Sequence, residues 1–231
     1  MLAAIAIVPS APVLVPELAG AAAAELAEAR AAVIAAAASL PPRWIVIGAG
    51  RADGAWRPET AGTFAGFGAD LRVRLSPPAG EQAEQLAELP LCALFAAWAR
   101  GQARPEASAE VRVYAGTHGA DAALARGRQL RTEIDQSAEP TGVLVVADGV
   151  TTLTPTAPGG YEPRDAGVQR ALDDALACGD IAALSRLPEQ VVGRVAFQVL
   201  AGLAEPAPRS TKELYRGAPY GVGYFAGVWQ P

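Results

Sequence analysis

Residues 143–164 read Val-Leu-Val-Val-Ala-Asp-Gly-Val-Thr-Thr-Leu-Thr-Pro-Thr-Ala-Pro-Gly-Gly-Tyr-Glu-Pro-Arg, and this stretch indicates the fold. The apolar, β-branched run Val143–Val146 is typical of a strand that is buried on both faces. Asp148 follows at the carboxyl end of this strand, where open α/β sheets bind their ligands. Prolines and glycines then predict a stiff loop around Tyr161 before a helical pattern begins at Pro163. Asp148 therefore either forms part of a site wall or simply turns the chain.

The rest of the chain alternates apolar strands with helical periods. Strands are expected at Ala3–Val8, Trp44–Ile47, Leu71–Leu75, Val111–Ala115 and Tyr220–Trp229, the last of these within the sheet from Tyr224. Helices are expected from Pro16 or Glu17 to Ser39, and at Glu81–Arg100 with a break at Pro90, Gly119–Asp135, Arg164–Cys178 and Pro188–Ala204. This order predicts right-handed parallel crossovers. We expect one α/β domain over residues 1–231, with a mostly parallel central sheet and helices on both of its faces.

Composition excludes several classes of function. The chain has 231 residues, is 51% hydrophobic with much of that alanine, and carries a net charge of -5. No basic cluster stands out, so nucleic-acid binding is not expected. Cys92 and Cys178 lie far apart, which argues against a disulfide framework or a cysteine metal site. The alanine-rich run near the N-terminus carries Glu25 and Glu28 and lacks a positive flank, so we expect a cytoplasmic protein without a membrane partner.

The second predicted strand is followed by Gly48-Ala49-Gly50, which resembles the start of the glycine loop after a dinucleotide-binding strand. A Rossmann loop must lead into a helix whose N-terminus holds the pyrophosphate. Residues 51–58 contain Asp53, Gly54 and Pro58 and show no apolar period, so they predict no helix. We therefore expect no dinucleotide cofactor.

Two motifs carry a family resemblance. Asp148 together with Ala157-Pro158-Gly159-Gly160-Tyr161-Glu162-Pro163-Arg164 resembles the strand end and Ala-Pro-Gly-Tyr-Asp-Pro-Arg loop of class III extradiol ring-cleavage dioxygenases. This family includes the catalytic subunit of protocatechuate dioxygenase and Memo-like relatives. The segment from Val8 to Glu17 is similar to the family's N-terminal Pro-His-Pro-Pro-Leu-Leu-Ile-Pro-Glu motif. The resemblance implies the α/β fold of the extradiol dioxygenase catalytic subunit and Fe(II)-dependent opening of a catecholic ring.

The chain departs from this family at the functional positions. The resemblance places metal-binding histidines at Ser10 and at the strand end Gly48–Gly50, and a catalytic histidine at Thr151. His118 is the single histidine of the chain, whereas a facial Fe(II) site needs two histidines and a carboxylate. Even a site shared between subunits would receive only His118 from each one. We therefore predict a degenerate metal site and no metal cofactor at a family-type centre.

The sequence leaves other kinds of catalysis or metal binding possible in the same cleft. His118 follows a predicted strand and is either a general base, a residue that caps the next helix, or a residue of a polar loop. Ser10 and Thr151 carry hydroxyl groups, but neither lies in a Gly-x-Ser-x-Gly elbow. Asp148 with Glu17 or Asp53 offers oxygen ligands for a hard cation such as magnesium, although no spacing demands it.

Three hypotheses about function follow. The first, which we favour, is a family member that has lost iron and binds a small molecule or a partner. The second is an enzyme with metal-free or oxygen-ligated-metal chemistry, with His118 and Asp148 as candidate catalytic groups. The third is a structural protein whose cleft is filled by side chains. The sequence also allows the protein to form a homo-oligomer.

The predicted pocket is built from strand ends. Parallel strands would bring Ser10, Gly48, His118 and Asp148 to one edge of the sheet, with Pro12 and Thr151 beside them. The 158–163 loop would fold over this edge and bring Tyr161 near Ser10. We expect Asp148 to be partly buried and ionised, held by donors such as the Thr151 side chain or backbone amides.

Overall fold

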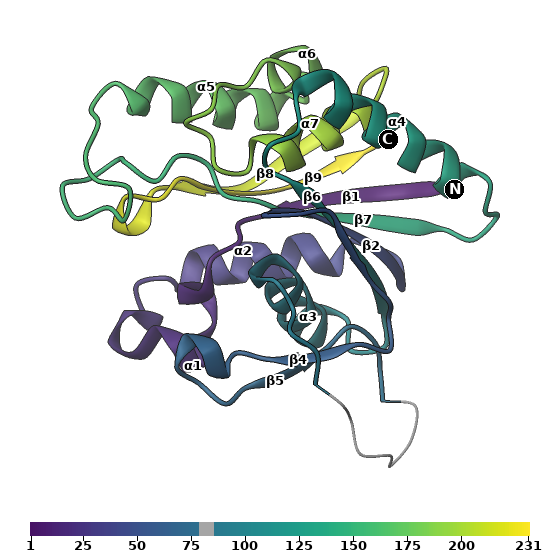
Figure 1. Ribbon diagram of the computed structural model, residues 1–231, viewed down its shortest axis with the longest axis horizontal. Helices are drawn as coiled ribbons and strands as arrows, with labels where there is room; N and C mark the ends of the chain where they lie inside the picture. Colours follow the sequence, from purple (N-terminus) through teal and green to yellow (C-terminus); the bar gives the residue numbers. More distant parts are fainter. Residues whose placement is uncertain (79–85) are drawn as a thin grey trace.

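Seven strands form one mixed sheet in the computed structural model, which describes residues 1–78 and 86–231 (Figure 1). Their order across the sheet is β3-β6-β2-β7-β1-β9-β8. Their bounds are β1 Leu2–Val8, β2 Arg43–Gly50, β3 Gly54–Trp56, β6 Ser108–Ala115, β7 Thr141–Val146, β8 Ser210–Gly217 and β9 Tyr224–Gln230. The four central strands β6, β2, β7 and β1 are parallel, whereas β3, β9 and β8 join by antiparallel pairing. This confirms the predicted mostly parallel α/β fold.

Helices cover both faces of the sheet, in two layers that Figure 1 shows below and above it. One layer contains α2 (Ala27–Ala38) and α3 (Leu91–Ala103). The other contains α4 (Ala120–Asp135), α5 (Asp165–Cys178), α6 (Ile181–Ser185) and α7 (Arg194–Leu203). Shorter elements are α1 (Pro16–Ala19), a separate hairpin of β4 (Ala61–Thr63) with β5 (Arg72–Arg74), and 3-10 turns at Pro12–Leu14, Gly20–Ala23, Ala65–Phe67 and Pro219–Gly221.

The strand sequences explain the two layers. Successive side chains of a strand point to opposite faces, so Ala6 and Val8 of β1 pack toward α2 and α3. Ile5 and Ile7 of the same strand pack toward α4–α7. Both sets are fully buried, which is why the central strands read as continuous apolar runs.

Helices α4 and α7 approach each other closely through two glycines. A Cβ at Gly127 would overlap the carbonyl oxygen of Val199, and a Cβ at Gly202 would overlap the carbonyl oxygen of Leu124. Glycine at both positions therefore lets the two backbones touch, and α7 packs against the sheet beneath α4.

Several predicted boundaries are wrong for local reasons. The helix expected over Glu17–Ser39 is interrupted at Gly20, whose φ of 53° lies in the left-handed region. The helix expected from Pro188 begins only at Arg194, because the amides of Val192 and Gly193 donate to the 148–149 backbone instead. Tyr220 has a φ of 57°, so the closing strand starts at Tyr224.

The sequence pattern misses one helix and three strands: β3, β8 and β4, the short partner of β5 in the separate hairpin. Strand β8 is polar and exposed because it lies at the edge of the sheet, and β3 is a three-residue edge strand. The short helix α6 (Ile181–Ser185) stands where the pattern predicts only turns. Helix α3 begins directly after Pro90. Residues 86–90 are not helical, so the helix expected from Glu81 is wrong there, and residues 81–85 lie outside the described residues. Within residues 1–78 and 86–231, none of the helices has the length and apolar character needed to cross a membrane.

Candidate functional site

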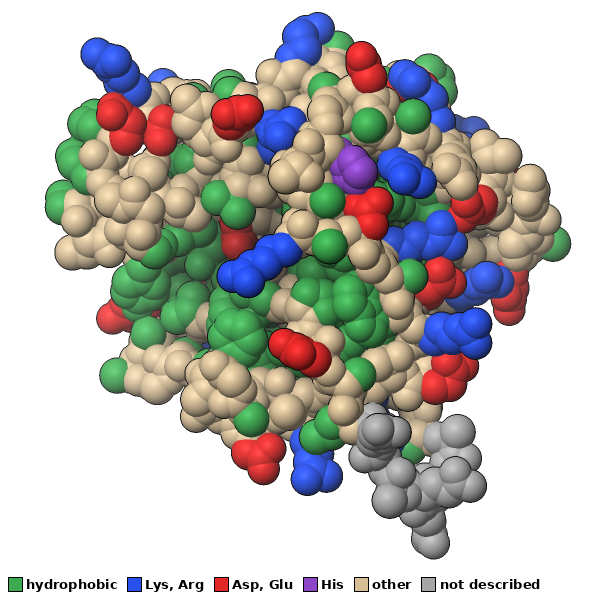
Figure 2. Space-filling model, in the orientation of Figure 1, with side chains coloured by type: hydrophobic (Ala, Val, Ile, Leu, Met, Phe, Trp, Pro, Cys, Tyr) green, Lys and Arg blue, Asp and Glu red, His purple; other side chains and the backbone are tan. Residues whose placement is uncertain are grey.

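A cavity of about 820 Å³ opens at the carboxyl edge of the parallel strands. Its lining comes from the strand ends, the turn after β2, the start of α3 and the segment before α7, and it includes Ser10, Gly50, Ala52, Cys92, Asp148 and Gly193. In Figure 2 apolar side chains gather in a hollow near the middle of this face, with charged side chains around it. A cavity at this edge is the usual ligand position in an α/β sheet.

Asp148 is the carboxylate that lines this cavity from the end of β7. Its Oδ1 accepts a 2.8 Å hydrogen bond from the backbone amide of Ser10. Loss of solvent raises the pKa of Asp148 to about 6, and the single amide only partly opposes this rise. Among the described residues Ser10 is the sole donor to this carboxylate, so the expected hydrogen bond from Thr151 is not formed.

The backbone around Asp148 is fixed by neighbouring elements. The Asp148 carbonyl accepts a 2.8 Å bond from the Gly193 amide, and the Gly149 carbonyl accepts one from the Val192 amide. The Gly149 amide donates to the carbonyl of Gly223 at 2.9 Å. The carboxylate is thus presented by a rigid backbone rather than by a free loop.

The loop of the family-like motif lies away from the cavity lining. The Gly159 amide donates to the Thr151 carbonyl, and the Glu162 amide donates to the Thr152 carbonyl, so the loop folds onto its own first residues. Tyr161 is 56% exposed. Neither Tyr161 nor Thr151 lines the cavity, and Pro12 does not line it either.

A buried polar pair that the sequence analysis misses anchors the start of this loop. Gln169 accepts a 2.9 Å bond from the Val150 amide and donates a 2.8 Å bond to Asp173. Asp173 is only 8% exposed, although the helical period places it on the solvent face with Asp174. Burial raises the pKa of Asp173 to about 6. The i, i+4 spacing of Gln169 and Asp173 is the signal that could have linked them.

Cys92 occupies the space beside Gly48. A Cβ at Gly48 would lie 2.5 Å from Cys92 Sγ and 2.8 Å from Cys92 Cβ, so a side chain at this position cannot be accommodated without a shift. Gly48 itself is buried beneath the lining, whereas Ala49, Gly50 and Cys92 reach the cavity. Burial raises the pKa of the Cys92 thiol to about 11, so the group is neutral at physiological pH.

These residues do not fit the Fe(II) centre that the family resemblance implies. Ser10 contributes its amide to Asp148, and the strand end at Gly48 is closed by Cys92. The part of the chain that the structure describes contains no group of three or more His, Cys, Asp or Glu side chains placed to hold a metal ion.

His118 does not line the cavity, but it contacts Asp53, which does. Its Nε2 is 2.7 Å from Asp53 Oδ1, which also accepts a 2.7 Å bond from the Ala115 amide. These two bonds, with Arg126 at 3.8 Å, hold the pKa of Asp53 below its ordinary value. Asp53 lines the cavity and His118 does not. The pair therefore ties the turn after β2 to the segment that precedes α4.

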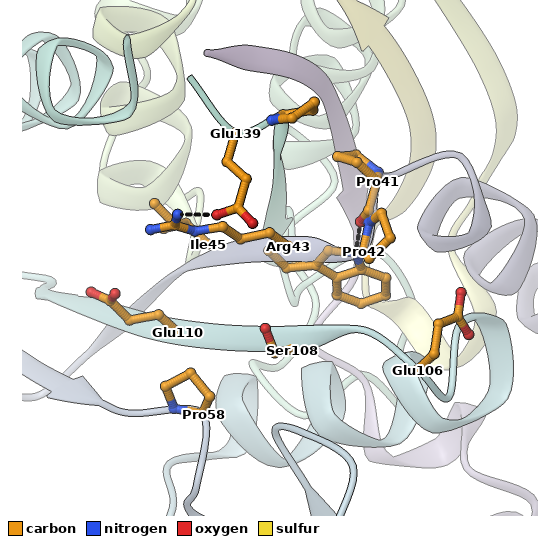
Figure 3. A pocket seen from close by; sticks show the side chains of 11 residues that line it. Pro41, Pro42, Arg43, Ile45, Pro58, Glu106, Ser108, Glu110 and Glu139 are labelled. Carbon is orange, nitrogen blue, oxygen red and sulfur yellow. Dashed lines mark hydrogen bonds and ion pairs between the residues drawn. The ribbon is translucent and has the colours of Figure 1, made fainter. Parts of the chain in front are cut away.

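A second hollow of about 560 Å³ lies at the opposite, amino edge of the sheet (Figure 3). Arg43 and Glu139 face each other across it and are joined by a 2.7 Å ion pair. Its other acidic side chains, Glu106 and Glu110, pair with Arg104 and Arg112. Because its charges are already paired, this hollow is a weaker candidate than the carboxyl-edge cavity.

Comparisons with known proteins support the fold alone. No protein-family profile matches the chain, and no curated protein matches it. The structure is similar to that of an uncharacterized protein, JW3007, from Escherichia coli K12, with a TM-score of 0.61 and 11% sequence identity. The likeness covers 99% of this chain and 100% of the E. coli chain.

Proposed function

We propose that this chain is a divergent relative of the class III extradiol dioxygenases that lacks a complete Fe(II) site and binds a small molecule at the carboxyl edge of its sheet. The observation that carries the proposal is the cavity of about 820 Å³ that contains the partly buried carboxylate of Asp148. Ligand pockets have volumes of roughly 300–1,000 Å³, with mainly apolar walls and a few placed polar groups. Trp56, Leu91 and Val113 supply such a wall.

The open cavity also separates this proposal from a purely structural role. A structural protein would gain stability by filling the strand ends with side chains, because interiors are close-packed. Here the space above the strand ends stays open, and Asp148 keeps acceptor capacity that no described residue uses.

A fragment screen by protein-observed NMR tests the proposal. We expect small aromatic and apolar fragments to shift the amide signals of residues that line the cavity, such as Ala49 and Val113. Ala52 is exposed at the cavity mouth, so an Ala52→Trp variant should lose these shifts. Ala125 is an exposed alanine on α4 outside the cavity, so Ala125→Trp is the matched control and should keep them. If no fragment shifts the amide signals of cavity residues in the wild type or in either variant, the proposal is refuted.

A metal analysis tests the loss of iron chemistry. Protein purified without a histidine tag should contain no stoichiometric iron, and oxygen uptake with catechols should stay at background. Stoichiometric Fe(II) held by the native chain would contradict the proposal, because ligands other than imidazole would then have to supply the site.

Metal-free acid–base catalysis in the same cavity is the second candidate. The observation in its favour is that Asp148 has a pKa of about 6, close to the range in which a general acid or base works well. Mass spectrometry of any fragment found to bind, after incubation with the wild-type protein and with Asp148→Asn, would reveal turnover. Chemical change that depends on Asp148 would favour the enzyme over the binding protein.

A further inference from the structure

We infer that the ligand of the carboxyl-edge cavity presents a protonated nitrogen to Asp148 and lays an apolar, aromatic-sized body against the strand ends. This inference rests on the function proposed above and adds the chemical class of the ligand. It is carried by three features of the cavity: the unused acceptor capacity of Asp148, the pairing of the other charges, and the apolar wall.

The carboxylate of Asp148 has room for a further donor. An ionised carboxylate offers about four acceptor positions, and the Ser10 amide occupies one of them on Oδ1. Oδ2 receives no hydrogen bond from any described residue, and Asp148 lines the cavity. A ligand that covered this oxygen without donating to it would leave a charge desolvated and unpaired, which is costly.

The other titratable groups in the interior of the cavity are either paired or neutral, so Asp148 carries the unpaired charge there. Asp53 is already matched by His118 and the Ala115 amide. The Cys92 thiol is neutral, and desolvation keeps the Tyr224 phenol neutral through a raised pKa. Anionic ligands would therefore meet a carboxylate of the same sign.

The mouth of the cavity adds one charge of each sign. Arg51 and Glu88 are exposed lining residues, and neither makes an ion pair or hydrogen bond with another described residue. The positive charge of Arg51 and the negative charge of Glu88 give the mouth no net charge from this pair. Water also screens these exposed charges more than it screens the charge of Asp148. The amides of Val192 and Gly193 before α7 are used by backbone carbonyls, so they offer no anion site.

The apolar wall of the cavity favours a ligand whose uncharged part is apolar or aromatic. Trp56, Leu91, Val113, Val146 and Val192 give it apolar surface. Trp56 also offers an aromatic face, which attracts cations as well as rings. The combination of an enclosed carboxylate and an apolar wall matches an arylalkylamine or a comparable cationic amphiphile.

Three matched probes test the inference: benzylamine, benzyl alcohol and benzoate, which share a ring and differ in charge. NMR titrations at pH 7.5 should place benzylamine in the cavity with an affinity roughly 10-fold or more above both others, as a charge-assisted hydrogen bond allows. Asp148→Asn should abolish this preference. Asp173→Asn removes the other carboxylate whose pKa burial raises to about 6, but Asp173 does not line the cavity, so this variant should keep the preference.

A second measurement needs no variant. Lowering the pH of the wild-type protein from 7.5 to 5 protonates Asp148 and should weaken benzylamine binding several-fold while benzyl alcohol binding stays constant. Equal binding of benzylamine and benzyl alcohol within the cavity, or tighter binding of benzoate, would overturn the inference and leave the proposed binding function standing. If none of the probes shifts a cavity residue, both are overturned.

Discussion

The backbone amide of Ser10 donates a 2.8 Å hydrogen bond to Oδ1 of Asp148, which joins the segments that follow β1 and β7. This bond links the two chain segments at the carboxyl ends of the paired central strands β1 and β7. The Asp148 carboxylate lines the cavity and receives no hydrogen bond from any other described residue. The stability of the protein and its ligand preference therefore depend on the same group.

Asp148→Asn should stabilise the protein at neutral pH. The pKa of Asp148 is raised from 3.8 to about 6, so the folded protein binds the proton more tightly than the unfolded chain. Ionising Asp148 then costs folding stability, a cost that is absent below about pH 4 and complete above about pH 6. Since one pKa unit corresponds to about 1.4 kcal/mol, the gain from asparagine at pH 7.5 is about 2–3 kcal/mol.

Urea denaturation of both proteins at pH 7.5 and pH 4 measures this gain. The difference between the variant and the wild type should shrink toward zero at the lower pH. The sequence alone suggests the opposite sign, a loss of charge-assisted bonds, because it predicts several donors to Asp148. A variant that is less stable than the wild type at pH 7.5 would show that such donors exist.

Gly48→Ala should destabilise the protein by roughly 1–3 kcal/mol, as overpacking of a core does. The new methyl group would collide with Cys92 Sγ. Cys92→Gly should relieve that collision, so a double-mutant cycle should give a favourable coupling between the two substitutions. Additive effects in thermal or urea unfolding would mean that Cys92 does not fill the space beside Gly48.

Gly127→Ala and Gly202→Ala should each cost about 3 kcal/mol or more, because each Cβ would overlap a backbone carbonyl that cannot rotate away. Gly167→Ala in α5 is the matched control, since a Cβ there meets nothing within 4 Å. The control should be neutral or gain up to about 1 kcal/mol, as glycine-to-alanine changes in helices do. Urea unfolding of the three variants gives the comparison, and similar values for all three would contradict the close packing of α4 on α7.

Gln169→Leu should destabilise the protein by roughly 1–3 kcal/mol, because it leaves the Val150 amide without its acceptor in a buried place. Hydrogen exchange at Val150 should accelerate relative to that at Val143, which lies within the sheet. Unchanged exchange at Val150 would mean that Gln169 does not anchor the loop that follows Asp148.

The central sheet could be predicted because its parallel strands are buried on both faces. Runs such as Val143–Val146 and Trp44–Ile47 carry that signal in a few adjacent residues. Strand β8 escapes prediction for the opposite reason: it lies at the sheet edge, and its polar residues Ser210–Gly217 show no apolar run.

The candidate site was predictable only in part. The strand order correctly brings Ser10 and Asp148 to one cavity, because both follow parallel strands. The contact of Cys92 with Gly48 depends on how α3 packs on β2, which no local pattern records. Tyr161 does not line the cavity, because its loop bonds to its own first residues, and these bonds cannot be inferred from the prolines and glycines of the loop.

The most direct test of the account is a carbon-13 NMR titration of the Asp148 carboxyl group, with and without benzylamine. In the free protein the pKa should lie near 6. With benzylamine, which stays protonated throughout the titration, the pKa should fall because the bound cation stabilises the carboxylate. An Asp148 pKa near 4 in the free protein, unchanged by the amine, would contradict both the enclosed carboxylate and its role as the anchor of the ligand.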